Sequence, residues 1–344
     1  MKNSDKQPIP VIIIGGFLGA GKTTLLNYIL SEQHGVRVGV LVNDFGAINI
    51  DAKLVVGVDG DTVSLANGCV CCSVNDDLIS ACMELVQRNN PPELLIVETS
   101  GVSEPMPVAN SFSSPEIEKF MALDSILTVV DAEQFPDIMK GEMASLARLQ
   151  VRDADMLILN KVDLVDAKTL ETTKSLVRNI APGTRMLEST LGIVSLNLIT
   201  GMGLHTISKK NEPSTHHKHS HQHEHPFSTW QWTSDMPLSY PKLRLLIEHL
   251  PETIYRLKGI VYVEEMPSHQ VEVQVVGKRS NIGDTELWGE NSPQSEIVMI
   301  ASKNGIDQDT MQRAFDDCIG TGDESQSPIL RLTRFLAMDK EATT

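Results

Sequence analysis

A glycine-rich segment within residues 12–31 constrains the fold of this chain more than any other part of the sequence. It runs from an apolar stretch through the pattern G-x-x-x-x-G-K-[ST] into a helical pattern. In such a loop, backbone N–H groups surround nucleotide phosphates, and glycine is needed where a side chain would block that approach. The segment therefore predicts a phosphate-binding P-loop rather than a glycine-rich turn that only packs a helix on a sheet. The predicted contacts come from Gly16, Gly19, Ala20, Gly21, Lys22, Thr23 and Thr24.

Two side chains at the end of this loop are expected to act directly on the nucleotide. Lys22 is expected to reach the β- and γ-phosphates as a point charge, and Thr23 to place its hydroxyl on Mg²⁺. The helix predicted at residues 22–31 directs the positive end of its dipole at the same anion. With a carboxylate supplied from elsewhere in the chain, these two residues form the predicted catalytic group.

Short β-rich apolar runs alternate with helical patterns from residue 10 to about residue 200. This alternation predicts right-handed βαβ units, and hence an α/β fold with a mainly parallel sheet covered by helices on both faces. Ligands bind outside the carboxyl ends of the strands in such sheets, so the residues that follow each run are the candidates for function. The runs are 11–14, 36–42, 62–65, 94–97, 126–130 and 156–159, with a further short strand near 185–188.

The fourth and sixth runs end in polar residues suited to a guanine nucleotide. Glu98 ends the fourth run, where a carboxylate reaches Mg²⁺ directly or through water, and Gly101 follows where a loop N–H senses the γ-phosphate. Asp163 follows the sixth run. An ionised aspartate there accepts two hydrogen bonds from guanine, and adenine lacks that donor pair, so the spacing favours GTP over ATP. Asn160 either bonds guanine or braces the P-loop, and the Lys161 stem covers the ring face.

Three of the five cysteines stand close together, at Cys69, Cys71 and Cys72. Thiolates are soft ligands suited to Zn²⁺ or Cu(I), and three local ligands leave a position open for a further donor. An inert or oxidation-sensitive thiol cluster is the alternative. The other two, Cys82 and Cys318, lie in helical patterns and are expected in the core.

The polar segment 43–51 follows the second run, where a switch loop of a P-loop enzyme lies. Asp44 and Asp51 are candidates to hold Mg²⁺ or a second metal ion. The alternative is that both carboxylates cap turns or helices.

The overall composition argues against two classes of partner. The net charge of −16 disfavours general nucleic-acid binding, which needs a surplus of Lys and Arg. No stretch approaches the roughly 18 consecutive apolar residues of a membrane span, and the first ten residues are too polar for a signal peptide. We therefore expect no nucleic acid and no membrane among the partners, and a cytoplasmic location.

Residues 209–227 differ in composition from both flanking regions and are predicted to form a flexible linker. This His-rich tract has no apolar period, so it is either a polar spacer or a low-affinity metal buffer. Its candidate ligands are His216, His217, His219, His221, His223 and His225. The predicted domains are therefore a P-loop domain at 1–208, this linker, and a smaller α+β domain at 228–335 with a disordered tail to 344.

Taken together, these features resemble the CobW-type subfamily of P-loop GTPases, over nearly the whole chain. The resemblance rests on residues 16–23, 43–51, 69–72, 98–101 and 160–163, the His-rich hinge, and Arg256-Leu257-Lys258-Gly259. It implies slow GTP hydrolysis coupled to delivery of a metal ion, most often zinc, to a client metalloprotein. The cysteine cluster would then carry the ion, with Asp44 at the position of a metal-binding carboxylate.

The sequence also departs from GTPase patterns and leaves other functions open. Ser189-Thr190 stands where many GTPases carry a Ser-Ala backbone contact to guanine. No glutamine follows Gly101 to orient the attacking water, which suggests low intrinsic turnover. The alternatives are a GTPase for cobalt or nickel insertion, and a metal-storage or thiol-sensing binding protein. A homo-oligomer is compatible with each of these functions.

Overall fold

The structure is a computed structural model that describes residues 8–32, 36–43, 62–65, 73–200 and 227–320. Contacts within the chain divide it into two compact units, Met1–Thr200 and Gly201–Thr344. The linker predicted at 209–227 lies outside the described residues, apart from its last position. None of the helices in the described ranges is long and apolar enough to cross a membrane.

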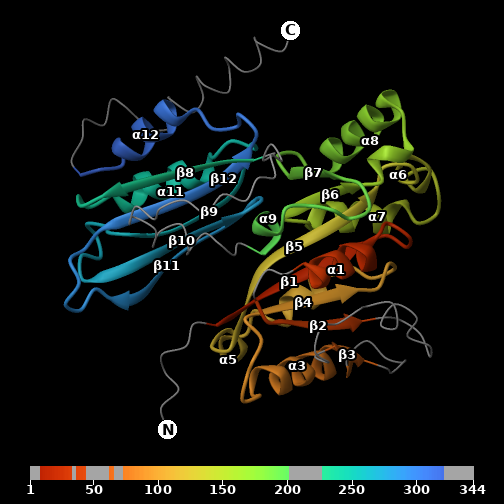
Figure 1. The fold of residues 1–344 in the computed structure, drawn as a ribbon, viewed down its shortest axis with the longest axis horizontal. Helices are drawn as coiled ribbons and strands as arrows, with labels where there is room; N and C mark the ends of the chain where they lie inside the picture. Colours follow the sequence, from red (N-terminus) through yellow and green to blue (C-terminus); the bar gives the residue numbers. More distant parts are fainter. Residues whose placement is uncertain (1–7, 33–35, 44–61, 66–72, 201–226, 321–344) are drawn as a thin grey trace, which may run out of the picture. The chain divides into compact units, whose positions relative to one another are not determined.

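The first unit alternates strands and helices along the chain, as the apolar runs predict (Figure 1). Every predicted strand is present, and most extend by one to five residues beyond the apolar run. In chain order the elements are β1 (Ile9–Gly16), α1 (Lys22–Ser31), β2 (Val38–Asn43), β3 (Thr62–Leu65), α3 (Ser73–Val86), β4 (Leu94–Thr99), α4 (Pro105–Asn110), α5 (Pro115–Glu118), β5 (Met121–Asp131), α6 (Phe135–Ile138), α7 (Ala144–Asp153), β6 (Met156–Asn160), η1 (Val162–Leu164), α8 (Ala167–Ile180), β7 (Arg185–Ser189) and α9 (Leu196–Thr200).

These strands form one parallel sheet with the order β3-β2-β4-β1-β5-β6-β7. The central strand β1 is apolar throughout because both of its faces are covered. Val11 and Ile13 join a core cluster with α3 and α4, while Ile12 and Ile14 are equally buried on the opposite face. A parallel sheet buried on both faces requires such continuous apolar strands. The predicted α/β P-loop fold is confirmed.

The register of the strands places the polar ends of several strands side by side. Ile14 of β1 lies opposite Glu98 of β4, and Asn43 of β2 lies opposite both Thr99 of β4 and Leu65 of β3. Because all the strands are parallel, their carboxyl ends meet at one edge of the sheet. The segments that follow β1, β2, β3 and β4 therefore all leave from the same edge.

The second unit is the predicted α+β domain, with an antiparallel sheet in the order β11-β10-β9-β12-β8. Its elements are β8 (Phe227–Ser234), α11 (Tyr240–Glu248), β9 (Ile254–Val261), β10 (His269–Val276), β11 (Arg279–Leu287), β12 (Ser295–Ser302) and α12 (Gln308–Asp316). The helices pack against the sheet through an apolar core. At its centre Phe315 of α12 contacts Trp230 and Trp232 of β8, with ring centroids 5.7 and 5.4 Å apart.

Strand β11 is a strand of the second unit that the sequence does not predict. Its nine residues contain only two large apolar side chains, Ile282 and Leu287, so they show no period-2 pattern. β11 is an edge strand, paired with β10 alone. Backbone hydrogen bonds to β10, rather than burial of its own side chains, hold β11 in place. A single sequence shows little sign of such pairing.

The two described cysteines are both buried and chemically shielded. Cys82 of α3 and Cys318 after α12 are fully buried, as predicted, and burial raises the pKa of each thiol to about 12. Both thiols therefore remain protonated in the folded protein at neutral pH, and the reactive thiolate is absent. The pKa of each thiol is higher in the folded protein than in the unfolded chain, where it is near 9. The resulting contribution to stability is fully present below pH 9 and is lost as the pH rises from about 9 toward 12.

We predict that a thiol reagent at pH 8 modifies at most three of the five cysteines in the folded protein and all five in guanidinium. The substitution Cys82→Ala should leave the native count unchanged and lower the denatured count by one. Rapid reaction of a fourth thiol in the native protein would contradict the burial of Cys82 and Cys318.

Candidate functional site

The glycine-rich loop turns between β1 and α1 through backbone conformations that exclude side chains. Gly16 and Gly21 have φ values of 133° and 104°. A Cβ atom at Gly16 would lie 2.3 Å from the Val129 carbonyl oxygen, and one at Gly21 would lie 2.3 Å from Asn160 Nδ2. Only glycine fits at either position. The loop has the strand–loop–helix context that the P-loop pattern requires.

The three residues of the predicted catalytic group lie together at the start of α1. Thr23 Oγ1 donates a hydrogen bond to Glu98 Oε1 over 2.9 Å, and Glu98 is only 2% exposed at the end of β4. The Lys22 ammonium donates to the Phe17 carbonyl within the loop, at 3.3 Å. A hydroxyl and a carboxylate are hard oxygen ligands of the kind that Mg²⁺ prefers, so this pair fits the ion. Their roles toward Mg²⁺ and phosphate remain predictions.

Asn160, at the end of β6, connects two loops through its side-chain amide. Nδ2 donates to the Ala20 carbonyl of the P-loop at 3.0 Å, and Oδ1 accepts from the Gly192 N–H at 3.0 Å. Asn160 is 2% exposed. Of the two roles that the sequence leaves open, this geometry favours bracing the P-loop over bonding guanine.

Lys161 is held beside the site by a buried carboxylate. Its backbone adopts a left-handed conformation with φ 61°, and its ammonium forms a 2.7 Å ion pair with Asp131 Oδ2. The other carboxylate oxygen of Asp131 accepts from the N–H groups of Glu133 and Gln134, at 2.9 and 3.1 Å. Asp131 therefore caps the turn after β5 and also fixes Lys161. Asp163 lies two residues further on in η1, exposed to solvent.

The loop after β7 contains the Ser189-Thr190 pair that departs from the usual GTPase pattern. Ser189 Oγ donates to the Ile193 carbonyl at 3.1 Å, which closes the loop on itself. Gly192 packs against α1 so closely that a Cβ atom would lie 2.9 Å from the backbone N and Cα of Leu25. Together with the bond from Gly192 to Asn160, this packing fixes the loop beside the P-loop helix.

Gln150 of α7 is a positioning residue that the sequence does not reveal. It is 1% exposed, and its Nε2 donates to the carbonyls of Gly101 and Ser103 at 3.2 and 2.9 Å. Gly101 in turn touches the P-loop, because a Cβ atom there would lie 2.7 Å from the backbone N of Leu18. Gln150 therefore holds the loop that carries the predicted γ-phosphate contact. A glutamine in an amphipathic helix gives no sign of such a partner 49 residues away.

Several predicted metal ligands lie outside the described residues. They are Asp44, Cys69, Cys71, Cys72, His216, His217, His219, His221, His223 and His225. Within the described part of the chain, no group of three or more His, Cys, Asp or Glu side chains could hold a metal ion. The predicted metal sites remain predictions.

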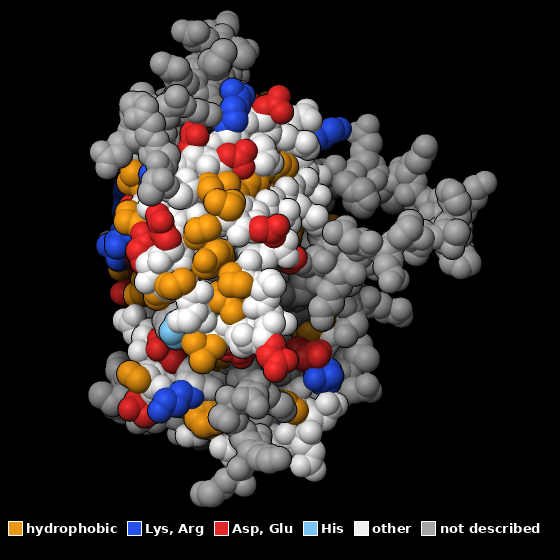
Figure 2. All heavy atoms as spheres, turned by 90° about the vertical axis from the view of Figure 1, so that its left-hand side faces the viewer, with side chains coloured by type: hydrophobic (Ala, Val, Ile, Leu, Met, Phe, Trp, Pro, Cys, Tyr) orange, Lys and Arg blue, Asp and Glu red, His pale blue; other side chains and the backbone are white. Residues whose placement is uncertain are grey.

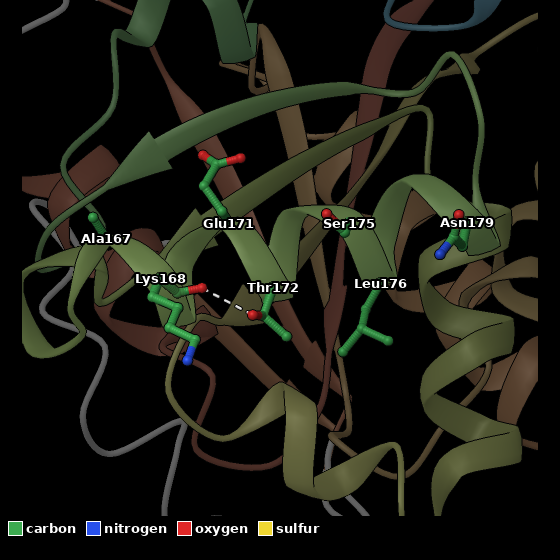
Figure 3. A pocket seen from close by; sticks show the side chains of 7 residues that line it. All are labelled: Ala167, Lys168, Glu171, Thr172, Ser175, Leu176 and Asn179. Atoms are coloured by element: carbon green, nitrogen blue, oxygen red, sulfur yellow. Dashed lines mark hydrogen bonds between the residues drawn. The ribbon is translucent and has the colours of Figure 1, made fainter.

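The outer face of α8 forms a shallow pocket that is separate from the P-loop (Figure 3). Its lining residues are Ala167, Lys168, Glu171, Thr172, Ser175, Leu176 and Asn179. All of them come from one helix, and the Thr172 hydroxyl is already bonded to the Lys168 carbonyl at 2.8 Å. This pocket offers no loop of backbone N–H groups, so it is not a candidate for the triphosphate.

Comparison with known proteins identifies the family. The CobW/HypB/UreG nucleotide-binding domain matches residues 10–188, more than half of the chain. The chain belongs to the CobW/HypB/UreG family. Its second unit matches the C-terminal domain of the cobalamin synthesis protein cobW, at residues 227–319. The resemblance inferred from the motifs is confirmed, and it covers both units of this CobW family protein.

Three relatives are similar over most of this CobW family chain. A protein of Sinorhizobium named zinc chaperone CobW is 29% identical, over 90% of this chain and 97% of its own length. A zinc chaperone CobW of Pseudomonas aeruginosa is 30% identical, over 86% of this chain and 88% of its own length. The zinc-regulated GTPase metalloprotein activator 1 of Dictyostelium discoideum is 31% identical, over 76% of this chain and 57% of its own length.

We predict that Asn160→Asp weakens GTP binding by about 5- to 150-fold. The change replaces the Nδ2 donor with an oxygen that faces the Ala20 carbonyl, and an unsatisfied buried group costs about 1–3 kcal/mol. Titration with a fluorescent GTP analogue measures the effect. The matched control, Asn179→Asp on the exposed face of α8, should bind as the wild type does (Figure 3). Equal affinity of both variants would refute the bracing role.

We predict that Gln150→Leu lowers the rate constant of GTP hydrolysis by about tenfold and changes GTP affinity less than threefold. The leucine removes both donors to the loop that carries Gly101 but leaves the P-loop contacts intact, and each lost buried bond costs about 1 kcal/mol or more. Single-turnover hydrolysis and equilibrium binding separate the two effects. Gln134→Leu, at an exposed position before α6, is the control. Equal losses in rate and affinity would indicate general damage to the fold.

Proposed function

We propose that this protein is a GTP-hydrolysing metallochaperone that delivers zinc to client metalloproteins. Membership of the CobW/HypB/UreG family supports GTP hydrolysis, and relatives over most of the chain are named zinc chaperones and a zinc-regulated GTPase. The single structural observation that supports it best is the 2.9 Å contact between Thr23 and Glu98 at the end of a P-loop. We expect the protein to act in the cytoplasm, alone or as a homo-oligomer.

In this proposal the triphosphate binds over the glycine-rich loop. The backbone N–H groups of residues 16–24 face the phosphates, and Lys22 exchanges its bond to Phe17 for the β- and γ-phosphate oxygens. Thr23 and Glu98 would hold Mg²⁺, which neutralises charge on the phosphates when it is bound. The N–H of Gly101 would contact the γ-phosphate, and its loop is positioned by Gln150.

The guanine base would bind at the ends of β6 and β7. Asp163 is exposed in η1, so its carboxylate is open to accept from N1–H and the exocyclic amine of the base. The ion pair with Asp131 fixes the Lys161 ammonium, which leaves the methylene stem to lie along the ring face. Asn160 contributes indirectly, by holding the P-loop and the Gly192 loop in place.

The zinc ion is the cargo, and its proposed ligands are Cys69, Cys71, Cys72 and Asp44. Asp44 directly follows β2, and Cys69 comes four residues after β3. Both strands end at the edge of the sheet where β4 delivers Glu98 and Gly101, since Asn43 pairs with Leu65 and Thr99. The segments with the proposed zinc ligands and the loop with the proposed γ-phosphate contact therefore follow adjacent strand ends.

This adjacency matters because the release of thiolate-bound zinc requires a conformational change that lowers the zinc affinity. Zinc held by several thiolates is bound by on the order of 10 kcal/mol or more. Exchange of GTP for GDP reorders switch loops, and such loops can change the affinity for a second ligand. A nucleotide drives transfer only if its two states bind zinc with different affinities.

Zinc affinity measured in both nucleotide states tests the proposal. With a competing chelator, we expect the dissociation constants for Zn²⁺ in the GTP-analogue and GDP states to differ by at least tenfold. An ATP analogue should produce no shift, because Asp163 selects guanine. Cys71→Ser with Cys72→Ser should abolish tight zinc binding and retain GTP binding. Equal zinc affinity in both guanine states would refute the transfer cycle.

The six histidines at 216–225 favour a second candidate, in which the cargo is nickel or cobalt. Imidazole suits both metals, whereas a thiolate cluster favours zinc or copper(I). Competition among Zn²⁺, Co²⁺ and Ni²⁺ in the same binding assay distinguishes the two cargoes. A protein that only stores metal would show a GTPase rate independent of zinc.

A further inference from the structure

One end of the antiparallel sheet in the second unit gathers three segments that the nucleotide site does not use. At this end β8, β9 and β11 finish, and β10 and β12 begin. The turn after β8 is tied to the loop after β9 by a 2.8 Å bond from Leu238 N–H to the Tyr262 carbonyl. The loop after β11 is tied to the same region by a 3.0 Å bond from Trp288 N–H to the Ser268 carbonyl. We call this region the sheet-end surface.

The sheet-end surface exposes apolar side chains. Met236 is 58% exposed and Leu287 is 62% exposed. Trp288, which follows Leu287, packs edge-on against Tyr262, with ring centroids 6.3 Å apart. Figure 2, which faces this end of the sheet, shows hydrophobic side chains in a band with acidic side chains on both sides. A band of exposed apolar side chains is typical of a docking site.

The turns and loops at this end of the sheet carry carboxylates and no basic side chain. The exposed carboxylates are Asp235, Glu264, Glu265, Glu286 and Glu290. The segments 234–239, 262–268 and 288–294 contain no Lys or Arg. Glu265 accepts from the Tyr240 N–H at 2.9 Å, and the other four carboxylates are exposed in or beside the same turns and loops. The surface therefore favours an occupant with apolar side chains and positive charge.

The C-terminal segment of the chain has that chemistry and starts at this surface. Gly320, the last described residue, donates its N–H to the Pro237 carbonyl at 3.1 Å. Residues 321–344 lie outside the described residues. Within them, residues 329–338 (ILRLTRFLAM) comprise seven apolar residues, two arginines and no carboxylate.

We propose that residues 329–338 bind the sheet-end surface of the same chain, with Arg331 and Arg334 paired to its carboxylates. Eight residues lie between Gly320 and Ile329, and the nine Cα–Cα steps across them span up to about 30 Å, whereas five strands at about 4.8 Å spacing are about 19 Å wide. The tether therefore reaches any part of the surface. A short tether also raises the effective concentration of the segment to the millimolar range, so weak contacts are enough. This interaction is independent of the nucleotide site.

Hydrogen exchange on the full-length protein tests the proposal. We expect the amides of residues 329–338 to exchange at least tenfold more slowly than in a synthetic peptide of residues 326–340. Arg331→Glu with Arg334→Glu should remove the protection, and so should Glu264→Arg with Glu290→Arg. Combining all four changes should restore it. Glu252→Arg, exposed at the opposite end of the sheet, is the matched control and should leave exchange unchanged.

A second experiment adds the C-terminal segment as a separate peptide. The labelled peptide 326–340 should bind full-length protein that carries Arg331→Glu and Arg334→Glu, and should bind at least tenfold more weakly to the wild type, whose own segment competes. Equal binding to both proteins, or to neither, would overturn the proposal. Protection that appears only as a dimer forms in analytical ultracentrifugation would assign the surface to a second copy and would also overturn it.

Discussion

The side-chain amide of Asn160 is the contact on which the nucleotide end of the molecule depends. It bonds the Ala20 carbonyl and the Gly192 N–H, so it joins the P-loop to the loop after β7. Its Nδ2 also lies 2.3 Å from where a Cβ atom of residue 21 would be, so that position must be glycine. A change in any of these four positions would disturb the phosphate and base ends of the site together.

The parallel sheet provides the second constraint, because it brings distant residues to one edge. Thr23 and Glu98 are 75 positions apart and meet at 2.9 Å since β1 and β4 are adjacent in the sheet. The same register ends β2 and β3 beside β4, so the segments that contain Asp44 and Cys69 follow strands that finish next to the strand leading to Gly101. The proposed coupling of zinc to GTP therefore follows from the order of the strands rather than from a separate structural element.

In the second unit, the buried core and the exposed, acidic surface lie on different parts of the same sheet. Its core is built on one face of the sheet, where Phe315 packs against the two tryptophans of β8. The end of the sheet has the opposite character, with Met236 and Leu287 exposed among carboxylates. An acidic rim keeps such a surface soluble and makes it selective for a basic apolar segment. The proposed occupant, the C-terminal segment, follows Gly320, whose N–H bonds the Pro237 carbonyl at this surface.

The sequence by itself determined the fold class, the P-loop and the family. Continuous apolar runs, the glycines between Gly16 and Gly21, and the polar residues at strand ends are local signals, so Glu98 and Asp163 could be predicted as site residues from spacing alone. The tertiary structure alone decided the roles of Asn160, Gln150 and Asp131, because each depends on partners between 2 and 140 positions away. It also decided that β11 is a strand, since an edge strand is held by backbone pairing with β10 and carries little pattern of its own. Side-chain hydrogen bonds between distant residues produce no recognisable pattern in a sequence, whereas buried strands and phosphate-binding turns do.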